Sequence, residues 1–224
     1  MTAADSGSSD PDGAEPDGGE PDGSTRSVEI ELKFDADDDT PLPDFTALPG
    51  VASVGVAERR ELDARYYDTA EFALASAGYA LRRRSGGPDA GWHIKGPRIG
   101  GGRVEQHWPL GEDPDEPVPD ALRAAVGPVT DAELRLIARI LNTRTAYALS
   151  ADDGGLVAEF VDDRVTATDV RTGVVREWRE WEIELGDAAS ADPRAFFTAV
   201  DAAVQAAGGR AAASASKLAR ALGY

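Results

Sequence analysis

Three charged side chains at alternate positions, Glu29, Glu31 and Lys33, are spaced in a way that could support chemistry. Apolar residues fill the positions between them, and side chains alternate faces along a strand, so the pattern predicts a strand over residues 27–34 with the charges on one face. Two carboxylates this close repel each other unless a cation lies between them. Hard divalent cations prefer oxygen ligands and commonly act on phosphates. A solvated strand face is the competing interpretation of this segment taken alone.

Two later segments carry cations at the same alternate spacing. Arg82 and Arg84 share one face of a predicted strand over 79–84, and Lys95 shares a face with His93 in a predicted strand over 91–96. Guanidinium groups grip phosphate oxygens through paired hydrogen bonds. The pattern therefore predicts an anion-binding face, with an exposed basic strand as the alternative.

Glu105 shares a strand face with Arg103 and His107 in the predicted strand over 103–110. A carboxylate there could orient a neighbouring arginine through an ion pair, which gives Glu105 and Arg103 a supporting role behind a ligand. An ordinary cross-strand ion pair is the alternative.

A second Glu-x-Glu pair, Glu182 and Glu184, lies in a predicted strand over 174–185. Four carboxylates converging in one cavity would be prohibitive without cations. The chain offers suitable partners at Lys33, Arg82, Arg84, Lys95, Arg144 and Lys217. A cavity with acid on one wall and base on the other suits a metal-chelated polyphosphate.

Composition limits the classes of function. The chain of 224 residues has 41 acidic and 23 basic residues, a net charge of −18, two histidines and no cysteine. This charge argues against nonspecific nucleic-acid binding, and the missing cysteines exclude disulfides and thiolate metal sites. No apolar run is long enough to span a membrane, and no signal peptide is recognisable. We therefore expect a cytoplasmic protein with no nucleic-acid or membrane partner.

The basic residues are unevenly chosen, because only Lys33, Lys95 and Lys217 are lysines and the other 20 are arginines. High acidity with few lysines is typical of proteins from salt-loving archaea. Under such a bias, each remaining lysine is a candidate for a role that the planar arginine fork cannot fill.

The chain divides into a tail over residues 1–25 and one domain over residues 26–224. The tail has seven acidic residues, no basic ones and almost no apolar content, so it is predicted to be disordered. In the domain, strands are predicted over 27–34, 51–67, 79–84, 91–96, 103–110, 143–150, 156–162, 164–169 and 174–185. Helices are predicted over 42–48, 69–78, 122–126, 132–140, 192–207 and 214–222. The result is an α+β fold dominated by antiparallel strands. In a closed barrel, charges along one face of many strands would line a polar interior large enough for a charged ligand.

The ordered set of motifs resembles the CYTH family of triphosphate tunnel metalloenzymes. It begins with Glu29-x-Glu31-x-Lys33 and continues through Tyr67-Asp68-Thr69, Leu81-Arg82-Arg83-Arg84, Trp92-His93-Ile94-Lys95, Arg103-Val104-Glu105, Asn142-Thr143-Arg144, Val161-Asp162-Asp163, Glu182-Ile183-Glu184 and Ser216-Lys217-Leu218. The resemblance covers about residues 27–220, and all three lysines fall on its motifs. It implies an eight-stranded antiparallel tunnel barrel, with helices packed outside, that binds triphosphate groups with Mg²⁺ or Mn²⁺.

The same resemblance implies roles for individual residues. Glu29, Glu31 and Lys33 become the catalytic set, and Lys217 could cap one end of the tunnel. The implied metal-side carboxylates are Glu29, Glu31, Glu182 and Glu184 with Asp162 or Asp163, which the sequence does not separate. The implied triphosphate ligands are Lys33, Arg82, Arg84, Lys95, Arg144 and Lys217.

Three functions stay open. The first is hydrolysis of inorganic triphosphate or an organic triphosphate such as thiamine triphosphate. The second is a class IV adenylyl cyclase, and the third is a non-catalytic polyphosphate- or nucleotide-binding module. The Tyr67-Asp68-Thr69 segment followed by Ala77-Gly78-Tyr79 resembles the triphosphatase branch more. Dimers are common in such barrels, but nothing in the sequence fixes a homodimer.

Overall fold

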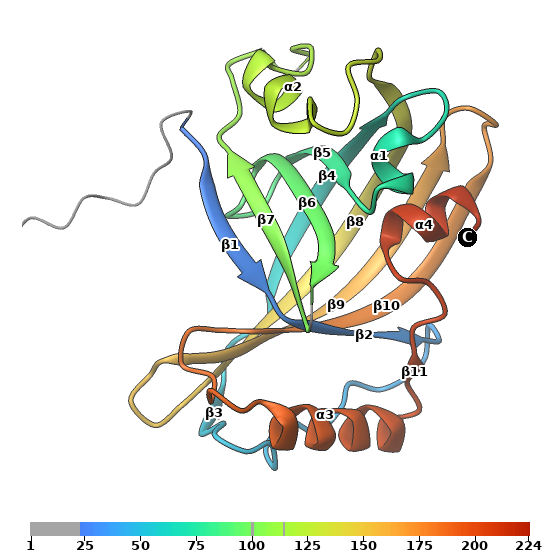
Figure 1. Ribbon diagram of the computed structural model, residues 1–224. Helices are drawn as coiled ribbons and strands as arrows, with labels where there is room; N and C mark the ends of the chain where they lie inside the picture. Colours follow the sequence, from blue (N-terminus) through green and yellow to red (C-terminus); the bar gives the residue numbers. More distant parts are fainter. Residues whose placement is uncertain (1–22, 100, 114) are drawn as a thin grey trace, which may run out of the picture.

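The computed structural model describes residues 23–99, 101–113 and 115–224 (Figure 1). Most of the predicted tail therefore lies outside the described residues. Its last residue, Thr25, already belongs to the first strand.

Long antiparallel strands dominate the described chain. The strands are β1 (Thr25–Glu29), β2 (Glu31–Ala36), β3 (Ser53–Val54), β4 (Glu58–Asp68), β5 (Ala80–Ser85), β6 (Gly91–Ile99), β7 (Gly102–Trp108), β8 (Arg135–Ser150), β9 (Leu156–Asp169), β10 (Val175–Leu185) and β11 (Arg210–Ala211). The helices are α1 (Ala73–Ser76), α2 (Asp120–Val126), α3 (Arg194–Ala207) and α4 (Lys217–Leu222).

The strands form one antiparallel sheet with the order β1-β7-β6-β5-β4-β8-β9-β10-β2-β11, and β3 pairs with the end of β8. β1 and β2 lie at or near opposite edges of this order although they are consecutive in the chain. Figure 1 shows the sheet curling so that β1 and β2 meet below β6 and β7. If β1 and β2 are counted as one interrupted strand and the two-residue strands β3 and β11 are left out, the wall has eight strands, which confirms the predicted tunnel barrel.

The predicted first strand is broken at Ile30. Glu29, before the break, pairs with Arg103 of β7, whereas Glu31, after the break, pairs with Glu184 of β10. The carbonyl of Ile30 accepts a hydrogen bond from the backbone N–H of Leu185 at 3.0 Å. The break lets one segment pair with both ends of the sheet, so it joins the two edges of the tunnel wall.

Apolar residues on the outer face of the sheet pack under helices. Phe34, Phe160 and Trp181 meet Phe196 and Val200 of α3, in a core beneath β2, β9 and β10. A separate core packs Leu81, Trp92 and Ile94 of β5 and β6 against residues of α1 and α2. These helices lie outside the barrel, as predicted, and leave the inner face to the charged residues.

The fourth helix is placed differently. Leu218 and Ala221 of α4 pack against Ala64, Tyr66 and Ile140, whose strands form part of the tunnel wall. Leu218 also lines the internal cavity, together with the same three residues. The start of α4 therefore forms part of the cavity wall.

The predicted helix over 132–140 is wrong, because residues 135–150 form the single strand β8. Leu134, Ile137 and Leu141 have helical spacing, but β8 pairs along its length with β4 on one side and β9 on the other. Hydrogen bonding to two neighbouring strands outweighs a short helical pattern, since tertiary context overrides local propensity.

Three smaller expectations also fail. Residues 42–48 form turns and loop rather than a helix, the long strand over 51–67 is divided into β3 and β4, and the two strands over 156–162 and 164–169 are one strand, β9. The break predicted between these two strands does not form, because Asp162 and Asp163 both pair with β8 and β10.

Candidate functional site

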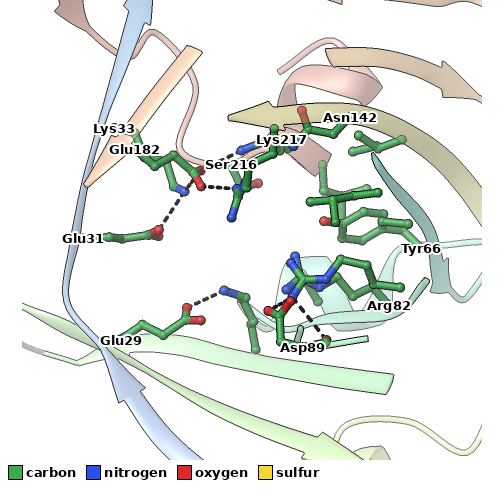
Figure 2. Close-up of a pocket in the computed structure, with 18 of the residues that line it drawn as sticks. Glu29, Glu31, Lys33, Tyr66, Arg82, Asp89, Asn142, Glu182, Ser216 and Lys217 are labelled. Carbon is green, nitrogen blue, oxygen red and sulfur yellow. Dashed lines mark hydrogen bonds and ion pairs between the residues drawn. The ribbon is translucent and has the colours of Figure 1, made fainter. Parts of the chain in front are cut away.

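The inner face of the tunnel lines a cavity whose empty space, open mouth included, is about 890 Å³. In Figure 2, Glu29 and Glu31 lie on one side of it, and Arg82 and Tyr66 lie on the other. The lining includes the carboxylates Glu29, Glu31, Asp89, Glu182 and Glu184 and the cations Lys33, Arg82, Arg84, Lys95, Arg103, Arg144 and Lys217.

All three lysines of the chain line this cavity, from three separate elements. Lys33 comes from β2, Lys95 from β6 and Lys217 from the first position of α4. Their convergence agrees with the expectation that a composition poor in lysine keeps the residue for a specific role. Lys217 does not merely cap an end, because its side chain reaches carboxylates of β9 and β10.

The second Glu-x-Glu pair, on β10, lies beside Glu31 and Lys33 of the adjacent strand β2. Glu31 is directly opposite Glu184, and Lys33 is directly opposite Glu182. Lys33 and Glu182 form an ion pair. Glu31 and Glu184 are like charges that face each other, an arrangement that destabilises a sheet unless something neutralises it.

Glu31 and Glu184 are incompletely neutralised by the protein. Lys33 lies 2.9 Å from the Glu31 carboxylate, and the half-exposed Arg98 lies 3.4 Å from it. Glu184 forms no ion pair with any residue in the described ranges, and burial raises its pKa above the usual value.

Glu29 belongs to a buried network with Glu105. Burial, followed by a hydrogen bond with Glu105, raises the pKa of Glu29 to about 8, although Lys95 contacts its carboxyl group. Burial opposes ionisation of Glu105 too, but hydrogen bonds with His93 and Glu29 and the charges of Arg82 and Lys95 hold its pKa well below the usual range. His93 Nδ1 lies 2.7 Å from a Glu105 oxygen, and Lys95 Nζ lies 3.3 Å from the other. Glu105 thus contacts His93, Lys95 and, at 3.5 Å, Arg82.

Arg103, the other residue predicted for that role, lines the cavity from β7. Its Nε donates to the carbonyl of Gly96 at 2.6 Å. This hydrogen bond therefore joins β7 to β6 at the residue that follows Lys95.

On β9 the structure separates the two aspartates. Asp163 points into the barrel, where Arg144 donates to both its oxygens at 2.8 and 2.7 Å and Lys217 lies 2.8 Å away. Asp162 points to the outer face and accepts hydrogen bonds from Arg179 and Trp181. The inclusion of Asp162 among the metal-side carboxylates is therefore wrong, because adjacent residues of a continuous strand face opposite sides.

Asp163, Glu180 and Glu182 bring three carboxylates within 4.8 Å of one another, the geometry of a metal site. The ammonium of Lys217 already lies among them, at 2.8, 2.5 and 2.8 Å. Burial disfavours its charge, but these carboxylates hold the pKa of Lys217 well above the usual value. The cluster is neutralised by the protein itself.

Two arginines of β5, Arg82 and Arg84, lie on the opposite wall, whereas Arg144 of β8 lies beside Asp163 and Glu182. All three side chains are largely buried. Burial, followed by repulsion from Arg82 and Arg144, lowers the pKa of Arg84 to about 9. The Nε atoms of Arg82 and Arg84 are buried without a hydrogen-bond partner among the described residues. This wall therefore has unused capacity for an anion.

Four residues of the site were missed in the sequence. Glu180 stands two residues before Glu182, so strand alternation alone could have found it. Tyr66 and Asn142 line the cavity as neutral groups beside apolar neighbours, and Asp89 reaches it from the turn between β5 and β6. Asn142 belongs to a motif of the resemblance but was given no role, and no motif contains Tyr66 or Asp89.

Among the described residues, the carboxylates that gather within 4.8 Å are Asp163, Glu180 and Glu182, but Lys217 already lies among them. The lining carboxylates left for a hard divalent cation are Glu29, Glu31 and Glu184. Carboxylate oxygens are the ligands that Mg²⁺ and Mn²⁺ prefer. Glu31 faces Glu184 across the two strands, and burial raises the pKa of Glu29 and of Glu184, so a cation bound beside them would favour their ionised forms. Among the described residues, no helix is long and apolar enough to cross a membrane.

Comparison with known proteins gives a curated relative in two strains of Mycobacterium tuberculosis, the uncharacterized proteins MT2285 and Rv2226. Each is 35% identical over 209 residues, which is 88% of this chain. The match covers 40% of either relative, so the chain spans less than half their length.

Among solved structures, a putative adenylate cyclase from Bacillus halodurans aligns with a TM-score of 0.58 and 18% identity, covering 87% of this chain and 97% of that one. The putative adenylyl cyclase HpAC1 from Hippeastrum aligns with a TM-score of 0.52 and 19% identity, covering 85% and 93%. These likenesses support the fold. The CYTH domain family matches residues 27–221, which is nearly all of the predicted domain, and the chain therefore belongs to the CYTH family.

Proposed function

We propose that this domain is a divalent-metal-dependent triphosphatase that hydrolyses inorganic or organic triphosphate inside its tunnel. One observation carries the proposal. A single cavity places an underneutralised carboxylate wall opposite a wall of buried arginines, with every lysine of the chain between or beside them. Phosphoryl transfer depends mostly on positioning and charge neutralisation, and this cavity offers both.

The cationic residues bind and orient the substrate in this proposal. Arg82, Arg84 and Arg144 contact one part of the phosphate chain, and Lys33, Lys95 and Lys217 contact the part nearer the carboxylates. Glu105 holds Lys95 and Arg82 in place through ion pairs at 3.3 and 3.5 Å. Since a triphosphate is only an acceptor of hydrogen bonds from these groups, a wall of donors recognises it without contacts to any attached organic group.

Glu29, Glu31 and Glu184 would hold the metal on the other wall. Bound Mg²⁺ or Mn²⁺ supplies charge neutralisation and Lewis acidity at the phosphate nearest that wall. Glu31 and Glu29 are the catalytic carboxylates in this account, and Lys33 spans Glu31 and Glu182 so that its ammonium faces the same phosphate. Asp163 and Glu182 hold Arg144 and Lys217, so their role is to position cations.

Two other activities stay as outcomes of the test. The solved structures of similar fold include proteins named as putative adenylate cyclases, and the Hippeastrum protein is described as having a dominant triphosphatase activity. A cyclase would release cyclic AMP and pyrophosphate from ATP. A binding module would retain the ligand without turnover.

Product analysis decides among them. The purified protein is given Mg²⁺ or Mn²⁺ with inorganic triphosphate, thiamine triphosphate and ATP in parallel, over a range of KCl concentrations, since salt screens exposed charges. We expect orthophosphate from at least one triphosphate, loss of that activity with a chelator, and no cyclic AMP. Cyclic AMP with pyrophosphate from ATP would replace the proposal with the cyclase. Tight binding without any product would replace it with the binding module.

A further inference from the structure

The turn between β5 and β6 sends one carboxylate, that of Asp89, into the anion-binding wall. Asp89 lines the cavity and forms an ion pair with Arg84. Figure 2 shows its side chain beside Arg82, on the side of the cavity opposite Lys33 and Glu182. A carboxylate in that position carries a negative charge and would repel a bound polyanion.

Asp89 is the acidic partner of Arg84, a buried arginine whose Nε has no hydrogen-bond partner among the described residues. The Arg84 side chain is 6% exposed, and Asp89 supplies its ion pair while the Asp89 carbonyl accepts from Arg84 Nη2 at 3.3 Å. Arg84 Nε has no hydrogen-bond partner among the described residues, and Arg82 and Arg144 repel its charge. A ligand phosphate that used Arg84 fully would have to take the place of the Asp89 carboxylate.

The surroundings of Asp89 let the side chain move while the backbone stays. Its carbonyl is held by Arg84 and lies 3.0 Å from His93 Nε2, so the turn is fastened at this residue. The side chain itself is 58% exposed, which leaves solvent as an alternative position for the carboxylate. Rotamer changes of exposed side chains take picoseconds to nanoseconds. Rotation of one side chain therefore clears the site without moving the strands.

From this arrangement, we propose that Asp89 occupies the anion subsite of Arg84 in the ligand-free protein, that a phosphate group displaces it, and that this competition sets the affinity for triphosphate. The inference rests on the proposed function, because it takes the ligand to be a triphosphate. A site whose competent state is only partly populated binds with an affinity reduced by that fraction. Removal of the Asp89 charge should therefore tighten binding, although it removes an ion pair.

The test is isothermal titration calorimetry with inorganic triphosphate, with and without Mg²⁺, on the wild type and on Asp89→Asn, which keeps the size of the side chain. Asp89→Ala is a second variant that lacks any competing polar group. Asp192→Asn is the matched control. Asp192 also pairs with an arginine and its side chain is also 58% exposed, but its partner Arg194 is 87% exposed.

We expect both Asp89 variants to bind inorganic triphosphate about tenfold more tightly, and at least about threefold, while Asp192→Asn stays within about twofold of the wild type. If the Asp89 variants bind inorganic triphosphate more weakly than the wild type, or equally well, this inference alone is overturned. Asp89 would then be a structural partner that holds Arg84 in place. Failure of the wild type and all variants to bind inorganic triphosphate would overturn the proposed function together with the inference.

Discussion

The last two glutamates of β10, Glu182 and Glu184, have the same spacing as Glu29 and Glu31, but the surroundings of the two side chains have opposite effects on their charge. Glu182 lies among three cations, Lys33, Arg144 and Lys217, and these hold its pKa well below the usual value although burial opposes its charge. Glu184, two residues later on the same face, faces Glu31 and has no ion pair among the described residues, and burial raises its pKa.

The difference shows that a repeated sequence pattern does not fix electrostatics. Strand alternation places both glutamates in the cavity, but the register of neighbouring strands decides which charge stands opposite each one. One half of the wall is balanced by the protein. The other half, at Glu29, Glu31 and Glu184, has an excess of carboxylate that suits a divalent cation.

The largest expected effect is at the balanced half. Lys217→Met removes the ammonium that contacts Asp163, Glu180 and Glu182, all of which are buried or nearly so. Loss of one partner from a buried charge cluster leaves uncompensated charge, so the free energy of unfolding should fall by about 3–5 kcal/mol. Urea denaturation measures it, with Arg194→Gln at an exposed ion pair as the control. A loss below about 1 kcal/mol would show that Lys217 does not neutralise the cluster.

The next effect is at the other half. Glu31→Gln should reduce triphosphate turnover at least about 100-fold, which is about 2.7 kcal/mol of barrier, because it removes a metal-side carboxylate. In metal-free buffer it should not destabilise the protein, since it also relieves repulsion from Glu184. Phosphate release and urea denaturation give the two readouts. The matched control is Glu177→Gln, an exposed glutamate on the outer face of β10. Full activity in Glu31→Gln with an intact circular dichroism spectrum would remove Glu31 from the site.

A smaller, pH-dependent effect is expected from Glu29. Its pKa is about 8 in the folded protein against an ordinary value of 4.5, so between these values the folded state keeps a proton that the unfolded chain has lost. The free energy of unfolding contributed by this group therefore falls as pH rises through this window, by at most about 1.4 kcal/mol per pH unit. Glu29→Gln can still donate to Glu105 and should lack this decrease. Metal-free urea titrations between about pH 5 and about pH 9 test it, and parallel curves for the two proteins would contradict it.

The smallest effect is expected away from both halves. Arg139 and Asp63 form a two-point ion pair on the outer face, where the arginine side chain is 48% exposed. Exposed pairs contribute about 0–1 kcal/mol, so Arg139→Gln should change the urea midpoint little, and less still in high salt. If Arg139→Gln lowered the free energy of unfolding as much as Lys217→Met, burial would not explain the difference between ion pairs in the cavity and ion pairs on the surface.

Much of this fold follows from strand alternation in the sequence. The faces that carry Glu29, Glu31 and Lys33, or Arg82 and Arg84, are those that the alternation predicts, and the barrel class is confirmed. Alternation is a local property, so it survives any arrangement of the strands.

Other features depend on pairing between distant segments, and the sequence does not show them. The break at Ile30 exists because one segment pairs with both β7 and β10. The choice between Asp162 and Asp163 depends on β9 continuing without a turn, which β8 and β10 enforce from either side. Lys217 was recognised from its motif, but its place among three carboxylates depends on where α4 docks.

The most direct test of the account is a crystal structure with Mn²⁺ and inorganic triphosphate, in which anomalous scattering locates the metal independently of any assumed role. We expect the Mn²⁺ peak beside Glu31 and Glu184. Lys217 should still lie among Asp163, Glu180 and Glu182. The phosphates should contact Arg82, Arg84 and Arg144. A peak among Asp163, Glu180 and Glu182, with Lys217 displaced, would contradict it.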